Sequence, residues 1–372
     1  MTPSLLAAPA DGYLATIAAH GLAGSLLDLP PAPLDPAPWR QLLGTVRYER
    51  ITGLLAKAVE EGALPVTPEQ EADAVEAALG GAARDLRLEQ LLLRVAGILG
   101  AAGVPFRVLK GPALAHTVYP DPALRSFGDI DLLVPGERFP EAHAALVDAG
   151  GTRRYPEPRP GFDRRFGKGA SYLMAGGLEV DVHRTLVAGS FGLTLDPARL
   201  FEGTATFQLA GRSLPVLGRE EQFVNACLHT ALGNARPRLS STRDVAQLLL
   251  HGGVDDARAL ALASAWQVDG VIAAAVASTW ATLGLADKVP LSTWAARYTP
   301  TRRDAEQLAR YTGRSRNTVA QTIEAVRVVR GLRAKAAYLY AVVLPERTAR
   351  GDGTLSRWRR GVRALRAKGR PE

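Results

Sequence analysis

Apolar residues in the first third of the chain recur at steps of three and four, the period of a helix with one buried face. The pattern predicts one helix over Trp39–Glu61, ended by a glycine and a proline. A second helix is predicted from the capping sequence Thr67-Pro68-Glu69-Gln70 to about Leu99, with an interruption at Gly80-Gly81. We therefore expect a helical N-terminal region.

The pattern changes after Gly103 to short apolar runs bounded by glycine and proline, which is typical of strands. The link Ala175-Gly176-Gly177 predicts a hairpin between the last two of these runs. Helices are predicted over Ala113–Tyr119 and Glu137–Ala149. The predicted strands are Val104–Leu109, Ile130–Val134, Ser171–Met174 and Leu178–Arg184. This order predicts a small mixed β-sheet with helices on one face.

Helical periodicity returns after Leu217 and continues to Pro345. The predicted helices are Glu220–Leu232, Thr242–His251, Asp255–Trp266, Val271–Leu283, Arg303–Arg310 and Asn317–Val343. The fold class is thus predicted as α+β. We expect a helical region at 1–102, an α/β core at 103–217, and a helical region with a basic tail at 218–372.

The composition is that of a soluble globular protein, with 47% hydrophobic and 22% charged residues in a chain of 372. The single cysteine, Cys227, excludes an internal disulfide framework, and the six histidines show no zinc-ligand spacing. We expect a cytoplasmic location, no signal peptide at the N-terminus, and no membrane span. The Ala-rich stretch Gly270–Ala286 is short for a span and predicts a buried helix.

Positive charge is concentrated at the C-terminal end of the chain. Residues 301–372 hold 18 Lys and Arg against 6 Asp and Glu, whereas the other residues have a balance of −4. Such a segment can attract nucleic acid. The alternative is a solvated helical surface, favoured because only Trp358 lies among the clustered arginines as a stacking platform.

Two carboxylates stand at the start of the strand Ile130–Val134. Strand alternation places Asp129 and Asp131 on one face, with their Cα atoms about 7 Å apart. Two carboxylates on one face repel each other unless a cation lies between them, and Mg²⁺ suits such a pair together with a phosphate chain. The alternative is an ordinary solvated strand start, or a guard at a sheet edge.

A third carboxylate is predicted on the strand Leu178–Arg184. Alternation places Glu179, Asp181 and His183 on one face. If this strand lies beside the Asp129–Asp131 strand, Asp181 completes a cluster that can hold two metal ions about 4 Å apart. Glu179 is the alternative third ligand. His183 is either a partner of the ligands or an ordinary polar strand residue.

A turn at Lys110-Gly111-Pro112 precedes the first predicted helix of the core. Glycine allows backbone amides to approach a phosphate, and Lys110 can contact a triphosphate; the alternative for this residue is an ordinary lysine at a strand end. Elsewhere, His229 is interpreted as a core histidine, and Arg243 and Asp244 as a structural ion pair at a helix start.

These residues resemble the DNA polymerase β-like nucleotidyltransferase superfamily, and more narrowly its bacterial branch of nucleotidyltransferase family proteins. The resemblance covers nearly the full length and is most specific over Leu109–Val134. The matching segments are Leu109-Lys110-Gly111, Arg125, Asp129–Val134, Asp181-Val182-His183, Cys227-Leu228-His229, Arg243-Asp244 and Leu344-Pro345. The chain departs from the superfamily in having Gly111-Pro112 where Gly-Ser is usual, and in a longer gap from Gly111 to Asp129.

The resemblance implies a metal-dependent enzyme that moves a nucleoside monophosphate from an NTP to a hydroxyl or phosphate acceptor and releases pyrophosphate. It implies that Asp129, Asp131 and Asp181 bind Mg²⁺ or Mn²⁺, and that Lys110, Gly111 and Arg125 bind the nucleotide. The acceptor is a small molecule, a peptide or a protein. The alternatives are a nucleic-acid-binding protein that uses the basic C-terminal segment, and a non-catalytic partner protein with a degenerate site.

Overall fold

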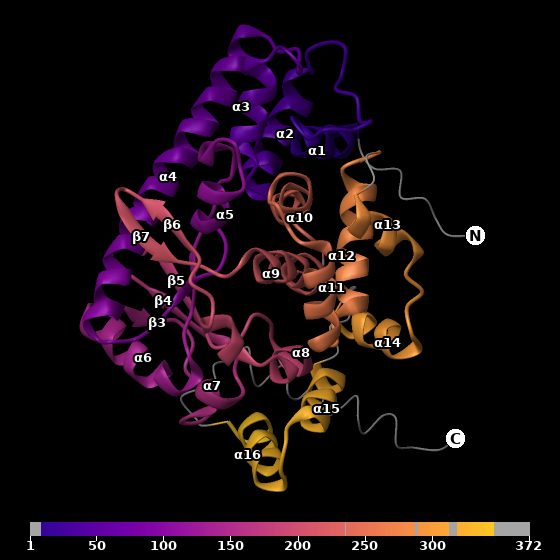
Figure 1. Ribbon diagram of the computed structural model, residues 1–372. Coiled ribbons are helices and arrows are strands. Elements are labelled where there is room, and N and C mark those ends of the chain that lie inside the picture. The colour runs from indigo at the N-terminus through magenta and orange to yellow at the C-terminus, as the bar shows by residue number, and fades with distance from the viewer. Residues whose placement is uncertain (1–8, 235, 287–288, 312–317, 346–372) are drawn as a thin grey trace, which may run out of the picture.

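The computed structural model describes residues 9–234, 236–286, 289–311 and 318–345. The N-terminal helices lie at one end, the main sheet lies to one side, and the C-terminal helices fill the other side and the opposite end (Figure 1). Within the described residues, no helix has both the length and the apolar character needed to cross a membrane. The α+β class predicted from the sequence is confirmed by the elements described below.

From residue 9 onward, where the described chain begins, the N-terminal region has four helices: α1 (Pro9–Ala19), α2 (Pro36–Glu49), α3 (Thr52–Glu60) and α4 (Pro68–Ala101). The predicted start of α4 is confirmed, because the side chains of Thr67 and Gln70 each accept from the other's backbone N–H. The single helix predicted over Trp39–Glu61 is wrong. Arg50 takes a left-handed conformation (φ 60°) that ends α2, and α3 begins two residues later.

The predicted interruption of α4 at Gly80-Gly81 is also wrong. The helix continues through both glycines. A Cβ atom at Gly81 would lie 2.8 Å from Oγ1 of Thr52 and 3.1 Å from Oγ of Ser126. The glycine therefore allows α3 and the segment before β2 to approach α4 closely.

The main sheet has five strands: β1 (Arg107–Val108), β2 (Ile130–Leu133), β3 (Thr152–Arg153), β4 (Gly169–Leu173) and β5 (Glu179–His183). Their order is β1-β2-β5-β4-β3, and only β2 and β5 are parallel. The predicted hairpin is confirmed as β4 and β5. A separate hairpin, β6 (Thr206–Leu209) and β7 (Arg212–Pro215), was not predicted.

Short helical segments connect these strands. They are α5 (Pro112–Thr117), η1 (Pro122–Leu124), η2 (Gly136–Arg138), α6 (Phe139–Asp148), α7 (Phe162–Arg165), η3 (Ala175–Gly177), α8 (Gly189–Thr194) and η4 (Pro197–Phe201). The two helices predicted in the core correspond to α5 and α6. The predicted helix from Glu137 begins instead with the 3-10 turn η2.

In the described part of the chain, eight helices follow the sheet: α9 (Arg219–Leu232), α10 (Leu239–His251), α11 (Asp256–Ala265), α12 (Asp269–Thr282), α13 (Pro290–Arg297), α14 (Arg302–Tyr311), α15 (Thr318–Val328) and α16 (Leu332–Val343). The buried helix predicted in the Ala-rich stretch is α12. The one helix predicted over Asn317–Val343 is instead two, because the chain turns at Gly331 (φ 85°). Asn317 itself lies outside the described residues.

The two faces of the main sheet have different surroundings. One face, which includes Ile130, Tyr172 and Val180, packs with α4, α6 and the β6–β7 hairpin. On the other face Leu133 packs with residues of α9, α10 and α12. The N-terminal helices have a core of their own, which also takes Ala246 from α10. The polar face of the sheet is thus turned toward the C-terminal helices.

Candidate functional site

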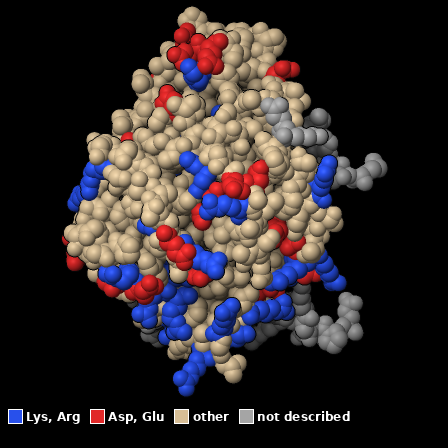
Figure 2. Space-filling view, in the orientation of Figure 1, with Lys and Arg blue, Asp and Glu red and all other residues tan. Residues whose placement is uncertain are grey.

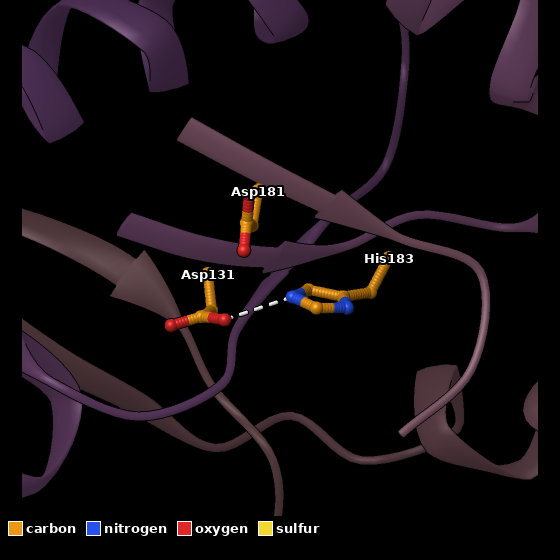
Figure 3. Close-up of side chains that lie close together, drawn as sticks. All are labelled: Asp131, Asp181 and His183. Carbon is orange, nitrogen blue, oxygen red and sulfur yellow. Dashed lines mark hydrogen bonds and ion pairs between the residues drawn. The ribbon is translucent and has the colours of Figure 1, made fainter. Parts of the chain in front are cut away.

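The two carboxylates Asp131 and Asp181 lie side by side in the sheet. Strands β2 and β5 pair so that Asp131 is opposite Asp181 and Leu133 is opposite His183. Ligand atoms of Asp131, Asp181 and His183 all lie within 4.8 Å of one another. Figure 3 shows the three side chains converging from the two strands. The expected juxtaposition of residues 131 and 181 is therefore present.

Asp131 is almost fully buried and has two partners. Its Oδ2 atom lies 2.9 Å from Nζ of Lys110, and its Oδ1 atom accepts a 2.8 Å hydrogen bond from Nε2 of His183. Burial alone would raise the pKa of Asp131, but the Lys110 ammonium and the hydrogen bond from His183 hold it well below its usual value. Asp131 is therefore an anion at neutral pH.

Asp181 has a different environment. Its Oδ1 atom is buried and has no hydrogen-bond partner among the described residues. Burial raises the pKa of Asp181, while the electrostatic interaction with His183 and a hydrogen bond from Ser171 lower it in part. A buried carboxylate oxygen without a partner is costly, so a ligand that supplies positive charge would be favoured here.

His183 completes the group. With Nε2 donating to Asp131, its Nδ1 atom is buried and has no partner among the described residues. Burial and the charge of Lys168 lower the pKa of His183, although Asp131 opposes them. Two carboxylates and a neutral imidazole, with an unpaired oxygen and an unpaired nitrogen, form a donor set that fits a divalent cation.

Asp129 lies outside this three-residue group. It stands just before β2, and its side chain is 27% exposed. Its Oδ1 atom lies 3.4 Å from Nη1 of Arg50, which comes from the junction of α2 and α3. Asp129 and Asp131 nevertheless line the same pocket. The metal role of Asp129 stays a prediction.

This pocket has a volume of about 170 Å³ and a strongly cationic lining. Four of its side chains are cations and two are carboxylates. The cations are Arg50, Lys110, Arg125 and Arg238. Gly111 also lines it, with a backbone conformation (φ 56°, ψ −113°) that favours glycine. An anion with several charges suits such a pocket.

Arg125 and Glu179 have partners of their own. Arg125 is buried and donates through Nε and Nη2 to the two carboxylate oxygens of Asp244, at 2.7 and 2.8 Å. Glu179 pairs with the exposed Arg154 at 2.7 Å. Nucleotide binding by Arg125 and a supporting role for Glu179 stay predictions.

Asp244 pairs with Arg125, so the interpretation of Arg243 and Asp244 as an ion pair is wrong. Arg243 does not pair with Asp244 but donates to the carbonyl oxygens of Ala18 and His20, so Asp244 is free to hold Arg125.

His229 is half-buried and lines the cationic pocket. The charge of Lys110, followed by burial, holds the pKa of His229 well below its usual value. His229 is therefore neutral beside the pocket.

Three cations near the carboxylates were missed by sequence reasoning: Arg50, Lys168 and Arg238. Arg50 precedes the carboxylate it contacts by 79 residues, and Arg238 follows the sheet in another helical region. Burial lowers the pKa of Lys168, which stands just before β4. An isolated arginine or lysine carries no local signal of such a role.

A family model described as "uncharacterised nucleotidyltransferase" matches residues 35–284, two thirds of the chain. The chain belongs to this family. The family range includes every residue predicted for the nucleotidyltransferase site. The predicted family resemblance is thereby confirmed. The reaction, its acceptor and the cytoplasmic location of the protein stay predictions.

One solved structure is similar to this chain, the solution structure of the antibiotic-resistance factor ANT(2'')-Ia. The two share 16% identity over 49% of this chain and 92% of that one, with a TM-score of 0.37. No curated protein matches the chain. Residues 346–372, which hold nine of the 18 Lys and Arg of residues 301–372, lie outside the described residues.

Proposed function

We propose that this nucleotidyltransferase moves a nucleoside monophosphate from an NTP to a hydroxyl or phosphate acceptor, with Mg²⁺ or Mn²⁺ as cofactor. The observation that carries the proposal is the pairing of Asp131 with Asp181 on adjacent strands, beside a pocket lined by four cations. Membership of the family supports the reaction type. In this proposal residues 103–217 supply the carboxylates, and the helical regions 1–102 and 218–372 add cations.

The residues divide into metal ligands and phosphate ligands. Asp131 and Asp181, joined by Asp129, would hold the cation, which when bound stabilises the charge on the phosphates. His183 fixes the orientation of Asp131 through its hydrogen bond. Lys110, with Gly111 and Arg125 beside it, neutralises the triphosphate, so that transfer depends mainly on position and electrostatics.

The bond changes are those of an in-line displacement. An acceptor oxygen forms a bond to the α-phosphorus of the NTP, the bond from that phosphorus to the bridging oxygen of the β-phosphate breaks, and pyrophosphate leaves. The proton of an acceptor hydroxyl passes to Asp181, which has a carboxylate oxygen without a partner among the described residues, and then to solvent.

The direct test is a screen of radiolabelled NTPs against host lysate, with Mg²⁺, for wild type, Asp131→Ala and Asp129→Ala. We expect label transfer by the wild type and none by either variant. Asp148→Asn is a matched control, because Asp148 is an exposed carboxylate at the end of α6. Transfer that is unchanged in both site variants would rule the proposal out.

Binding of nucleic acid is the second candidate, because positive charge gathers at one end of the molecule. Figure 2 shows Lys and Arg side chains over the region of α7, α15 and α16. Retention of RNA or DNA that falls steeply with salt, and is lost when residues 346–372 are removed, would support this function. Absent or salt-independent retention would exclude it. For a non-catalytic partner protein with a degenerate site, calorimetry with ATP and Mg²⁺ would show no heat.

A further inference from the structure

The pocket beside β2 holds more positive charge than its carboxylates neutralise. Lys110 is paired with Asp131, and Arg125 is paired with Asp244. Asp129 is the remaining carboxylate of the lining, which also holds two further cations, Arg50 and Arg238. Both arginines belong to helical regions outside the sheet. Neutralisation of the pocket's carboxylates therefore does not explain why these two arginines lie there.

Arg50 is held over the start of β2 by its backbone. It occupies the left-handed region at the end of α2, which costs about 1–2 kcal/mol for a residue other than glycine. Its guanidinium lies so close to Gly128 that a Cβ atom there would overlap it. The carbonyl of Gly128 is in turn held by Nη2 of Arg84, at 3.0 Å. The Arg50 side chain is thus directed at the segment that carries Asp129.

Arg238, at the start of α10, contacts the end of α2 next to Arg50. Its guanidinium lies over the ring of Tyr48, 4.7 Å from the centroid, and its Nη1 atom donates to the Tyr48 carbonyl. The adjacent Glu49 accepts a 2.7 Å hydrogen bond from the backbone N–H of Leu239. The end of α2 and the start of α10 therefore hold Arg50 and Arg238 close together at the pocket.

The contact between Arg50 and Asp129 is loose for an ion pair. The atoms are 3.4 Å apart, and the side chains are 31% and 27% exposed, so the pair contributes less than a close, buried one. Burial lowers the pKa of Arg50, Asp129 opposes this, and the charges of Arg238 and Arg125 add to it. Crowded cations of this kind would gain from an anion that enters the pocket.

We propose that Arg50 is an exchangeable counter-ion, which pairs with Asp129 while the pocket is empty and binds the NTP phosphates with Arg238 when the substrate enters. The inference rests on the proposed function and adds two residues to it. It assigns the junction of α2 and α3 a direct part in nucleotide binding. Release of Asp129 from Arg50 makes that carboxylate available to a cation.

The exchange predicts opposite effects on two ligands. Without Arg50, NTP loses a phosphate ligand and binds more weakly. A divalent cation alone loses a competitor for Asp129 and binds more tightly. A purely structural role of Arg50 would weaken both, because loss of the local fold would disturb the carboxylates as well. The pair of measurements therefore separates the two explanations.

The test is titration calorimetry of Mn²⁺ alone, and then of a non-hydrolysable ATP analogue with Mn²⁺. Arg50→Asn removes the guanidinium and keeps a residue that tolerates the left-handed backbone. We expect analogue affinity to fall roughly 10- to 100-fold, and Mn²⁺ affinity to rise about two- to fivefold. Arg50→Lys should lie between these, and Arg238→Gln should weaken only the analogue. Arg47→Gln is the control, because Arg47 is exposed on the same helix.

The possible results distinguish failure of the exchange from failure of the proposed function. If wild type binds both ligands and Arg50→Asn leaves both affinities unchanged, or weakens both, the exchange is wrong and the proposed function stands. If wild type binds neither Mn²⁺ nor the analogue, the proposed function is wrong, and so is the exchange, which rests on it.

Discussion

Asp131 and Asp181 are opposite each other on parallel strands, yet Asp131 lies between Lys110 and His183 whereas Asp181 keeps an oxygen without a partner among the described residues. The same substitution at the two positions should therefore have different effects on stability.

Asp131→Asn should strongly destabilise the metal-free protein. The substitution leaves Lys110, whose side chain is 19% exposed, without its anionic partner, and loss of one member of a buried pair costs about 3–5 kcal/mol. Asp129→Asn should cost less than about 1 kcal/mol, because its pair with Arg50 is loose and partly exposed. Urea denaturation in EDTA measures both. Equal losses would contradict the assigned environments.

Asp181→Asn should remove the stabilisation that a divalent cation gives. In the wild type, Mn²⁺ at 100 times its dissociation constant should raise the free energy of unfolding by about 2.7 kcal/mol. The variant should show little of this gain, because the unpaired oxygen of Asp181 is the open ligand position. Thermal unfolding with and without Mn²⁺ is the measurement, and Asp148→Asn should behave as wild type. A full gain in Asp181→Asn would exclude residue 181 as a ligand.

Gly111→Ala should reduce both stability and nucleotide binding. Its backbone has a positive φ, and a Cβ atom would lie 3.3 Å from Cβ of Phe127, so we expect a cost of about 1–3 kcal/mol. Gly97→Ala is the matched control in the exposed face of α4, where nothing lies within 4 Å and alanine should stabilise by about 0.5–1 kcal/mol. Denaturation and ATP-analogue titration check both variants. Wild-type stability in Gly111→Ala would show that the turn does not require glycine.

Local alternation along two strands predicted the faces of residues 131 and 181, and that the two residues meet if the strands are neighbours, which they are. The residues on either side of each carboxylate in its strand are buried and apolar. Because side chains alternate along a strand with a period of two, this determines the face on which each carboxylate lies. The β6–β7 hairpin also had a signal, because Phe207, Leu209 and Leu214 alternate around Ala210-Gly211, a turn with positive φ at both residues. That hairpin was predictable and was missed.

Other features depend on distant parts of the chain and have no local pattern. Arg50 and Arg238 reach the pocket only because α2 and α10 are fastened together through Tyr48 and Glu49. Gly81 resembles a helix breaker in sequence, but its role follows from the close approach of Thr52. These contacts depend on tertiary packing, so they cannot be predicted from the periodicity within one segment.

Asp244→Asn should cost about 3–5 kcal/mol, because it leaves Arg125 buried with its charge uncompensated. Replacing the pair, as Arg125→Met with Asp244→Leu, should recover most of that loss. If Arg125 also binds phosphate, the double variant will be stable and will still bind an ATP analogue weakly. Denaturation together with analogue titration separates the two roles. Wild-type affinity in the double variant would show that Arg125 is structural only.

Asp85 should make stability depend on pH between about 4 and 6. It is buried in α4 and accepts a 3.0 Å hydrogen bond from the backbone N–H of Phe127. Burial raises the pKa of Asp85 to about 6, although the hydrogen bonds from Phe127 and Ser126 oppose the shift. Because the folded-state pKa is above the unfolded value, the folded protein binds more protons in this range. Its stability must fall as pH rises from 4 to 6.

Asp85→Asn keeps an acceptor for Phe127 and removes the titration. The free energy of unfolding of wild type minus that of Asp85→Asn should therefore decrease by about 2.4 kcal/mol between pH 4 and pH 7, and most of the change should occur below pH 6. Urea denaturation at intervals of half a pH unit gives this difference, with the exposed-carboxylate variant Asp148→Asn as control. A difference that does not change with pH would mean that Asp85 ionises in the folded protein as readily as in the unfolded chain.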